Sequence, residues 1–254
     1  METGKNTFTI HTIDADNVDE MGFFCVNNRR HPGYISKRAW LQNRFKEGLR
    51  IKQVRAGNGK PAGFLEYIPG EYSWRVVKAE GYLVIHCLWV SSAKFGIKGM
   101  ASALLQECIE DARLQNRYGV AVVSSSGPWM ASKEIFLQNG FIQADEAPSG
   151  FQLLVYRSGR GPLPAFPTSW QERMNAFKGL TLLFTGQCPY IGKAIAELPP
   201  VAERFGTELS LVSIGSAAEA RAKMASPYGM FNLIYNGRLL ADHPISATRF
   251  RNIL

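Results

Sequence analysis

The chain has 254 residues, of which 46% are hydrophobic and 20% charged, and its formal net charge at pH 7 is +8. This composition excludes a disordered or low-complexity protein. The positive charge is spread along the chain, and the short cluster at residues 27–31 is interpreted as a solvated loop rather than a basic stripe. We therefore expect no nucleic-acid partner, and we regard the charge as suited to an anionic cofactor.

The residue types also indicate the cellular compartment of the protein. The first ten residues lack the apolar stretch of a signal peptide, and the longest nearly apolar run, Tyr82–Val90, is too short to cross a bilayer. Cys25, Cys87, Cys108 and Cys188 have no paired spacing that would predict a metal site or a disulfide framework. We expect a cytoplasmic protein with free thiols, no metal and no membrane partner, and we leave a homodimer open.

The first part of the chain predicts the order β-α-α-β-β. Alternating residues at the start predict a strand, Asp16 and Asn17 offer a cap for the first helix, and Ser36 offers one for the second. Gly57–Lys60 has the composition of a hairpin turn. The predicted elements are a strand at residues 7–13, helices ending near Cys25 and Glu47, and strands at Leu49–Ala56 and Ala62–Ile68.

From residue 81 onward, strands and helices alternate. Gly81–Val90 is rich in aliphatic and aromatic residues, as a buried strand is, and the apolar residues of Met100–Ala112 recur at helical spacing. This alternation predicts an α/β (α+β) fold, with a mixed sheet flanked by helices on both faces. The later elements are a short strand at Val120–Ser124, a helix at Ala131–Asn139 and a closing strand at Phe151–Arg157.

A glycine-containing loop joins the strand Gly81–Val90 to the following helix. Small residues there let the backbone approach a pyrophosphate, and the N–H groups and dipole at a helix N-terminus attract anions. The run Val-Ser-Ser-Ala-Lys-Phe-Gly-Ile-Lys-Gly-Met-Ala-Ser-Ala-Leu-Leu ending at Leu105 resembles the acetyl-CoA signature of the GNAT superfamily, Arg/Gln-x-x-Gly-x-Gly/Ala. Gly99 and Ala101 occupy its two small positions, whereas Gly96 departs from its first position.

The resemblance implies acetyl-CoA as the cofactor. In such enzymes the pantetheine arm enters a gap between two splayed strands and bonds to strand backbone. The coenzyme-binding residues so implied are Leu88, Trp89, Val90, Lys94, Phe95, Gly96, Ile97, Lys98, Gly99, Met100, Ala101 and Ser102.

A second motif, Met130–Phe141, resembles the later family helix that ends in Gly-Phe. Its spacing places Phe136 at the coenzyme site, where many members have the tyrosine that is usually proposed to protonate the leaving thiolate. Phenylalanine has no proton to give. Water or another group therefore protonates the thiolate, or the enzyme tolerates a weakly assisted leaving group, and Phe136 as a plain core residue is compatible with either.

The resemblance covers residues 7–157 and implies an N-acetyltransferase that acts on an amine of a small molecule or peptide. Direct attack needs a neutral amine, so a base or a water chain must remove a proton. Glu80 and His86 are the candidates for this base, although Glu80 also fits an exposed strand start and His86 a hydrogen-bonded structural residue. Candidates for the acceptor pocket, with packing or strand termination as the alternative for each, are Glu66, Tyr72, Trp74, Ser124 and Ser125.

The proline-rich stretch at residues 159–170 predicts a second domain. Beyond it, strand-like and helix-like runs continue as β-α-β-α-β-β-α, and Cys188-Pro-Tyr stands at the first strand-to-helix junction. This order resembles thioredoxin and glutaredoxin, and the whole arrangement resembles the GNAT proteins that carry a YoaP-type C-terminal domain. The expected domains are a GNAT domain at 1–158, a linker at 159–178 and a smaller thioredoxin-like domain at 179–254.

Two other functions compete with the acetyltransferase. The predicted helix begins near Cys188, and a helix N-terminus lowers a thiol pKa, so monothiol redox chemistry is one alternative. Ile191 stands where a Cys-x-x-Cys pair has its second cysteine, which favours a non-redox module. In the other alternative, the protein senses acyl-CoA and docks a partner without efficient turnover.

Overall fold

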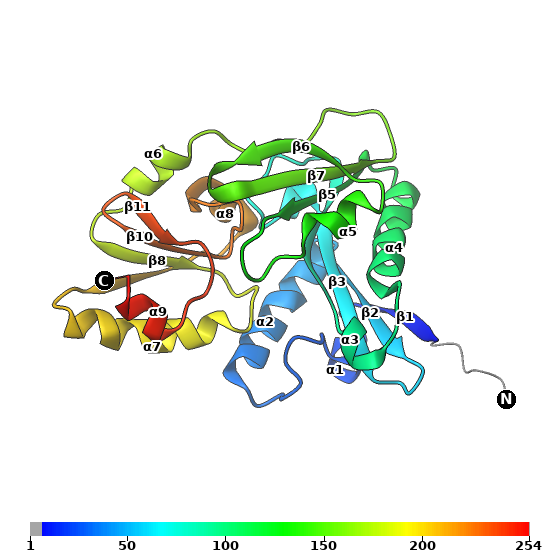
Figure 1. The fold of residues 1–254 in the computed structure, drawn as a ribbon, viewed down its shortest axis with the longest axis horizontal. Coiled ribbons are helices and arrows are strands. Elements are labelled where there is room, and N and C mark those ends of the chain that lie inside the picture. The colour runs from blue at the N-terminus through cyan, green and yellow to red at the C-terminus, as the bar shows by residue number, and fades with distance from the viewer. Residues whose placement is uncertain (1–6, 254) are drawn as a thin grey trace. The chain divides into compact units, whose positions relative to one another are not determined.

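The computed structural model describes residues 7–253 of the chain (Figure 1). The chain forms two compact units, each made of segments that are separated in the sequence. The predicted domains begin at residue 1 and end at residue 254, and residues 1–6 and 254 lie outside the described residues. The first unit contains residues 7–27, Gln42–Ser73 and Ala79–Ala165, and the second contains Asn28–Leu41, Trp74–Lys78 and residues 166–253.

The first unit is built on a seven-stranded sheet with the order β1-β2-β3-β4-β5-β7-β6 (Figure 1). The parallel pair β4–β5 lies in the middle, and the other neighbouring strands are antiparallel. The prediction of a large mixed sheet flanked by helices is therefore confirmed. The strands are β1 (Phe8–Ile13), β2 (Arg50–Ala56), β3 (Pro61–Pro69), β4 (Tyr82–Val90), β5 (Gly119–Ser124), β6 (Ile142–Ala147) and β7 (Phe151–Arg157).

The main helix of this unit, α4, covers one face of the central strands (Figure 1). Its apolar residues at helical spacing, among them Leu104, Leu105 and Ile109, are fully buried against β3, β4 and β5. Besides the 3-10 turns η1 (Gly70–Tyr72) and η2 (Pro148–Gly150), the helices here are α1 (Val18–Met21), α3 (Ser92–Phe95), α4 (Met100–Leu114) and α5 (Lys133–Leu137).

Some element boundaries differ from the prediction. The helix expected from Ser36 is α2 (Pro32–Lys46), which starts at a proline because proline suits the first helical turn. Strand β6 was not predicted. None of its side chains is buried at the edge of the sheet, and the short alternation at residues 142–145 contains a single large apolar residue, which is too little to mark a half-buried strand.

The second unit contains a four-stranded sheet with the order β11-β10-β8-β9, in which β8 and β9 are parallel and the other pairs antiparallel. The helix expected from Cys188 begins at Ile191, because a residue that precedes proline disfavours the helical region. The elements are α6 (Trp170–Asn175), β8 (Leu180–Phe184), α7 (Ile191–Arg204), β9 (Leu209–Ser213), α8 (Ala217–Lys223), β10 (Phe231–Tyr235), β11 (Arg238–Ala241) and α9 (Ala247–Arg251).

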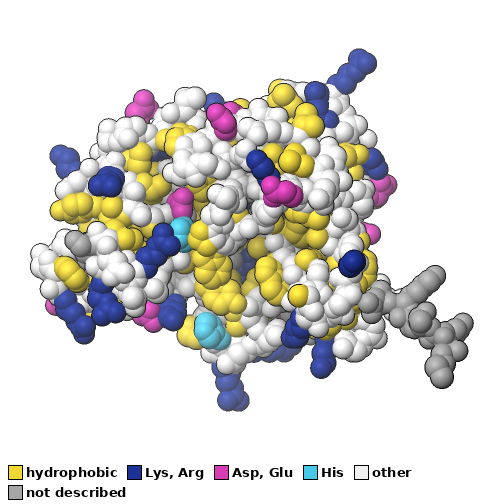
Figure 2. All heavy atoms as spheres, viewed as in Figure 1, with side chains coloured by type: hydrophobic (Ala, Val, Ile, Leu, Met, Phe, Trp, Pro, Cys, Tyr) yellow, Lys and Arg dark blue, Asp and Glu magenta, His cyan; other side chains and the backbone are white. Residues whose placement is uncertain are grey.

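The surface charge and the lengths of the helices bear on two expectations from the sequence, the absence of a basic stripe and of a membrane-spanning segment. On the face drawn in Figure 2, Lys and Arg side chains are scattered among polar and apolar ones rather than gathered in one stripe. Among the described residues, every helix falls short of the length and apolar character that a bilayer crossing requires.

Candidate active site

The two parallel strands at the centre of the first sheet are paired over only part of their length and then separate. β4 pairs with β5 from Tyr82 to Ile85, opposite Gly119–Val122. Beyond this point β4 continues to Val90 in register with β3, while β5 continues in register with β7. The β4 edge that faces β5 is therefore left open over its carboxyl-terminal half, which is where the resemblance places the pantetheine arm.

A β-bulge lies at the point of separation. Glu66 pairs with Cys87 and Tyr67 with Ile85, so His86 is the extra residue on β4. The bulge brings the imidazole of His86 to the carboxylate of Glu66, with Nδ1 and Oε1 3.4 Å apart and side chains only 0% and 2% exposed. Two residues predicted in separate roles, base and acceptor pocket, thus form one buried pair.

The loop after β4 leads directly into the N-terminus of α4. Gly96 and Gly99 have φ values of 64° and 81°, a left-handed conformation that glycine adopts without strain. Ile97 and Met100 are 4% and 0% exposed, so the loop is held to the core from below. A Cβ atom placed on Gly99 would meet nothing within 4 Å, which means that open space lies over this residue.

The first turn of α4 can bind an anion in that space. Its hydrogen-bond ladder begins where Ala103 N–H donates to the carbonyl of Gly99 at 2.9 Å. The N–H groups of Met100, Ala101 and Ser102 precede this ladder, so they lack acceptors inside the helix. With the positive end of the helix dipole, they fit a phosphate or pyrophosphate group.

Charged side chains on the same loop add to this potential. Lys94 and Lys98 are both exposed, and the Nζ of Lys94 lies 5.5 Å from the ring centroid of Phe95. Long lysine side chains can follow a bound anion with little reorganisation of the backbone. The residues present therefore fit coenzyme A, whose phosphates are its charged groups.

Buried polar contacts fix the position of α4 against the sheet. Tyr67 O–H donates to Asp111 Oδ2, and Lys52 Nζ lies 3.1 Å from Glu107 and 3.5 Å from Asp111. Burial, with the nearby charges of Cys108 and Asp111, raises the pKa of Tyr67, so its hydroxyl stays a donor. The N-terminus of α4 is consequently carried on a rigid support.

One polar residue near this turn was not predicted. Asn139 Nδ2 donates to Ser102 Oγ at 3.0 Å and to the carbonyl of Ile135 at 2.7 Å, which ties the end of α5 to the first turn of α4. Asn139 belongs to the second motif, but sequence spacing gives no indication of its partner. It orients Ser102, a predicted coenzyme ligand.

Phe136, in contrast, lies within the core. It is 1% exposed and packs edge-on against Phe141, with ring centroids 5.6 Å apart. The same apolar cluster contains Ile97 and Met100. Phe136 therefore supports the loop from beneath, and its ring offers no proton for the reaction.

The other predicted base, Glu80, lies at the opposite end of β4. It is exposed and precedes Tyr82, the first residue of β4, which lies about 13 Å along the strand from His86 at the usual rise per residue. Hydrogen bonds link the segments at this amino-terminal end of β4, where Glu71 accepts from Arg117 at 2.8 Å and from Gly81 N–H at 3.1 Å. The structure does not bring Glu80 to the open end of the strands.

The predicted acceptor residues are also dispersed. Tyr72 is 46% exposed in η1, whereas Trp74 is 1% exposed in the second unit, where its ring lies 5.5 Å from that of Trp40. Ser124 is fully buried at the end of β5 and donates to the carbonyl of Ala131 at 3.0 Å. Of this set, Glu66 is the residue that contacts His86.

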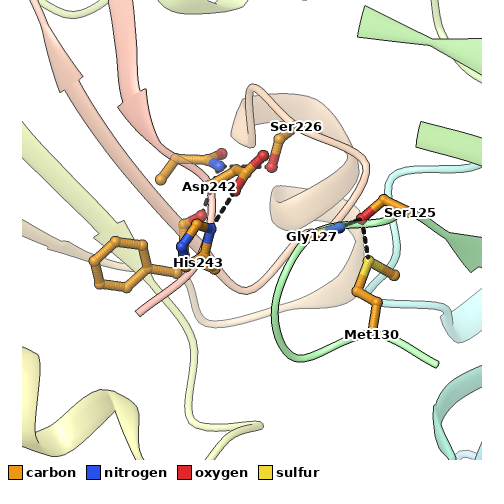
Figure 3. A network of polar contacts seen from close by, with 8 residues as sticks. Ser125, Gly127, Met130, Ser226, Asp242 and His243 are labelled. Carbon is orange, nitrogen blue, oxygen red and sulfur yellow. Dashed lines mark hydrogen bonds and ion pairs between the residues drawn. The ribbon is translucent and has the colours of Figure 1, made fainter. Parts of the chain in front are cut away.

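Ser125 stabilises the turn that follows β5. Its Oγ accepts a hydrogen bond from Gly127 N–H at 3.2 Å and lies 3.4 Å from the sulfur of Met130 (Figure 3). Both contacts are local to the loop, so the observed role of the hydroxyl is to shape this turn.

In the second unit, Cys188 lies half-buried before α7, in a loop that α2 approaches closely. A Cβ on Gly33 would lie 2.1 Å from the carbonyl oxygen of Pro189, and one on Gly186 would lie 3.3 Å from Trp40. Two positions of α2, Gly33 and Trp40, thus pack against the loop on both sides of Cys188. Elsewhere in this unit, His243 Nδ1 and Asp242 Oδ1 lie 2.6 Å apart (Figure 3).

Comparisons with known proteins find similarity to acetyltransferases. The chain is 28% identical over 247 residues to the Bacillus subtilis (strain 168) protein named uncharacterized N-acetyltransferase YoaP, and the match covers 95% of this chain and 96% of that protein. A scan against models of protein families finds no match.

Solved structures of acetyltransferases also resemble part of the chain. The ribosomal-protein-S18-alanine N-acetyltransferase of Escherichia coli matches at 14% identity and a TM-score of 0.42, over 61% of this chain and 97% of its own. The PaiA N-acetyltransferase of Thermoplasma acidophilum, solved with coenzyme A, matches at 11% identity and a TM-score of 0.41, over 59% and 99%. The predicted class, an N-acyltransferase, agrees with the name of the Bacillus subtilis relative.

Proposed function

We propose that the protein is an acetyl-CoA-dependent N-acetyltransferase that transfers the acetyl group to an amine of a small molecule or peptide. The observation that carries this proposal is the combination, in one unit, of the open space over Gly99 at the α4 N-terminus with the open edge of β4 beyond Ile85. One feature fits the phosphates and the other fits the pantetheine arm. The name of the Bacillus subtilis relative supports the same activity.

Each part of the site has a task in this reaction. The main-chain N–H groups from Met100 to Ser102, with Lys94 and Lys98, hold the phosphates. When bound, the coenzyme supplies an activated acetyl thioester, and transfer of the acetyl group to an amine releases the free thiol.

The Glu66–His86 pair is the proposed acceptor of the amine proton. The Glu66 carboxylate, whose Oε1 lies 3.4 Å from Nδ1 of His86, is close enough to stabilise a positive charge on the imidazole. The imidazole of His86 takes the proton that the amine loses as its nitrogen bonds to the acetyl carbon. Because Phe136 has no proton to give, water protonates the leaving thiolate, which is a fair leaving group when its thiol has an ordinary pKa.

Acetyl transfer to a panel of primary amines, followed by release of free thiol, tests this function. We expect His86→Gln to lower kcat about 10²- to 10⁴-fold with little change in the affinity for acetyl-CoA, as for the loss of a general base. Glu80→Gln, just before the opposite end of β4, is the matched control and should retain activity. Tight coenzyme binding without turnover on any amine would instead identify an acyl-CoA sensor.

We further propose that the second unit is a thioredoxin-like module in a non-redox role, added to a GNAT domain near residues 1–158. Its strand order and directions, β11-β10-β8-β9 with one parallel pair, support the fold. The packing of α2 on the Cys188 loop supports a structural use of that loop. Thiol titration tests this role, since a strongly depressed pKa of Cys188 would favour redox chemistry.

A further inference from the structure

Three aromatic side chains gather on the sheet face that carries Glu66 and His86. Phe64 and Trp89 are directly paired across β3 and β4. The ring of Phe24, from the loop after α1, lies 5.4 Å from that of Phe64 and 5.1 Å from that of Trp89. We call Phe24, Phe64 and Trp89 the aromatic wall. Trp89 is 50% exposed, so the wall presents an indole surface to solvent.

The backbone that delivers Phe24 to this wall is strained. Phe24 has a φ of 74°, and Cys25 N–H donates across it to the carbonyl of Phe23 at 3.0 Å, which is the pattern of a classic γ-turn. A bulky side chain rarely adopts this conformation. Phe23 is 1% exposed and anchors the turn in the core. Such strain persists where the surroundings enforce it, and it is concentrated at functional sites.

The wall lies next to the proposed proton acceptor. Phe64 is two residues from Glu66 on β3, so their Cα atoms are about 7 Å apart at the usual rise per residue. Trp89 lies beyond Ile85, on the stretch of β4 that has separated from β5. An acceptor whose nitrogen is near His86 can therefore place a neighbouring group on the wall.

We propose that the aromatic wall selects the acceptor, and that the acceptor is a primary arylalkylamine or a peptide N-terminus bearing an aromatic side chain. The inference rests on the proposed acetyl transfer. A planar ring gains offset or edge-to-face contacts with the indole of Trp89. A cation–π grip on the ammonium is the poorer use of the wall, because it would stabilise the protonated form that has to be deprotonated before attack.

A matched pair of amines distinguishes recognition of an aromatic ring from a cation–π contact with the ammonium group. 2-Phenylethylamine and 2-cyclohexylethylamine present rings of similar size to the same nitrogen, and only the first is aromatic. With wild-type protein and acetyl-CoA, we expect kcat/KM to favour the phenyl compound about three- to tenfold, the range that one aromatic pair provides. Trp89→Leu and Phe24→Gly should abolish this preference, whereas Ile142→Ala, which removes an exposed apolar side chain on β6, should keep it.

Phe24→Gly also separates function from folding. Glycine suits a φ of 74°, so this variant should unfold at a urea concentration no lower than a Phe24→Ala variant does, while both lose the preference for the aromatic ring. Retention of the preference in Phe24→Gly would overturn the role of the strained turn.

A binding measurement keeps the test independent of turnover. Quenching of tryptophan fluorescence by 2-phenylethylamine should exceed that by the cyclohexyl compound in wild-type protein and should not do so in Trp89→Phe. Equal kcat/KM for the two amines would overturn the inference and leave acetyl transfer intact. If 2-phenylethylamine quenches selectively but no amine is acetylated, acetyl transfer is overturned and the aromatic binding site remains. If tetramethylammonium binds more strongly than 2-phenylethylamine, the inference is overturned.

Discussion

Replacement of Gly99 by leucine should remove coenzyme binding and leave the protein folded. A leucine at a φ of 81° costs about 1–2 kcal/mol of backbone strain. In a domain of this size such a cost lowers the melting temperature by about 2–8 °C. No protein atom lies within 4 Å of the new Cβ, so steric conflict adds nothing to this cost in the free protein.

The loss of binding free energy for the coenzyme is larger than this loss of folding stability. A side chain over Gly99 fills the space in front of the first N–H groups of α4, and each charge-assisted hydrogen bond to a phosphate contributes about 1.5–3 kcal/mol. Loss of two such bonds weakens binding by about a hundredfold or more. Calorimetric titration with coenzyme A measures this effect.

The matched control is Gly59→Leu. Gly59 has a φ of 76° in the β2–β3 turn, and a Cβ there also meets nothing within 4 Å, so the two variants carry similar strain. We expect Gly59→Leu to bind the coenzyme as the wild type does. Wild-type affinity in Gly99→Leu would refute the assignment of the phosphates to this loop.

Three further predictions concern other parts of the chain. Glu66→Gln should lower kcat about 10- to 100-fold and leave the KM for acetyl-CoA unchanged, because the carboxylate orients His86; equal losses in both constants would indicate damage to the site as a whole. Cys188→Ser should retain acetyl transfer, and a loss above tenfold would place the thiol in the reaction. Burial raises the pKa of Glu71, but hydrogen bonds from its own N–H group, from Gly81 and from Arg117 outweigh this effect and lower it. Glu71 therefore stabilises the fold above its unfolded pKa near 4.5, and this contribution is lost as the pH falls through the folded value. Glu71→Gln should be less stable than wild type at pH 7 by about 0.5–1 kcal/mol after solvent screening, with a smaller difference at pH 3, and urea unfolding at the two pH values measures it.

The central sheet and its loop could be predicted from sequence because their signals are local. Val120 and its neighbours form a continuous apolar run, and the apolar stripe of α4 repeats at helical spacing, so both were found at nearly their observed positions. The glycines after β4 were informative for the same reason, since positive φ values restrict the residue type. Edge strand β6 gave only a weak signal, because none of its side chains is buried.

The arrangement of the site could not be read from spacing. The Glu66–His86 contact depends on a bulge that shifts the register of β3 and β4 by one residue, and no local pattern marks that shift. Phe24 presented no signal either, since a phenylalanine in a γ-turn contradicts its local preference and is held there by tertiary contacts. The burial of Phe136 was compatible with the sequence but could not be distinguished from a role at the coenzyme.

The division of the chain into non-contiguous segments has a consequence for its biosynthesis. Asn28–Leu41 and Trp74–Lys78 belong to the unit whose sheet starts only at Leu180. The ribosome therefore delivers Trp40 and Trp74 long before most of this unit, including the Gly186 loop that Trp40 approaches. Until the carboxyl-terminal half has emerged, these indoles remain uncovered, and a nascent chain that stalls near residue 158 would be a natural client for chaperones.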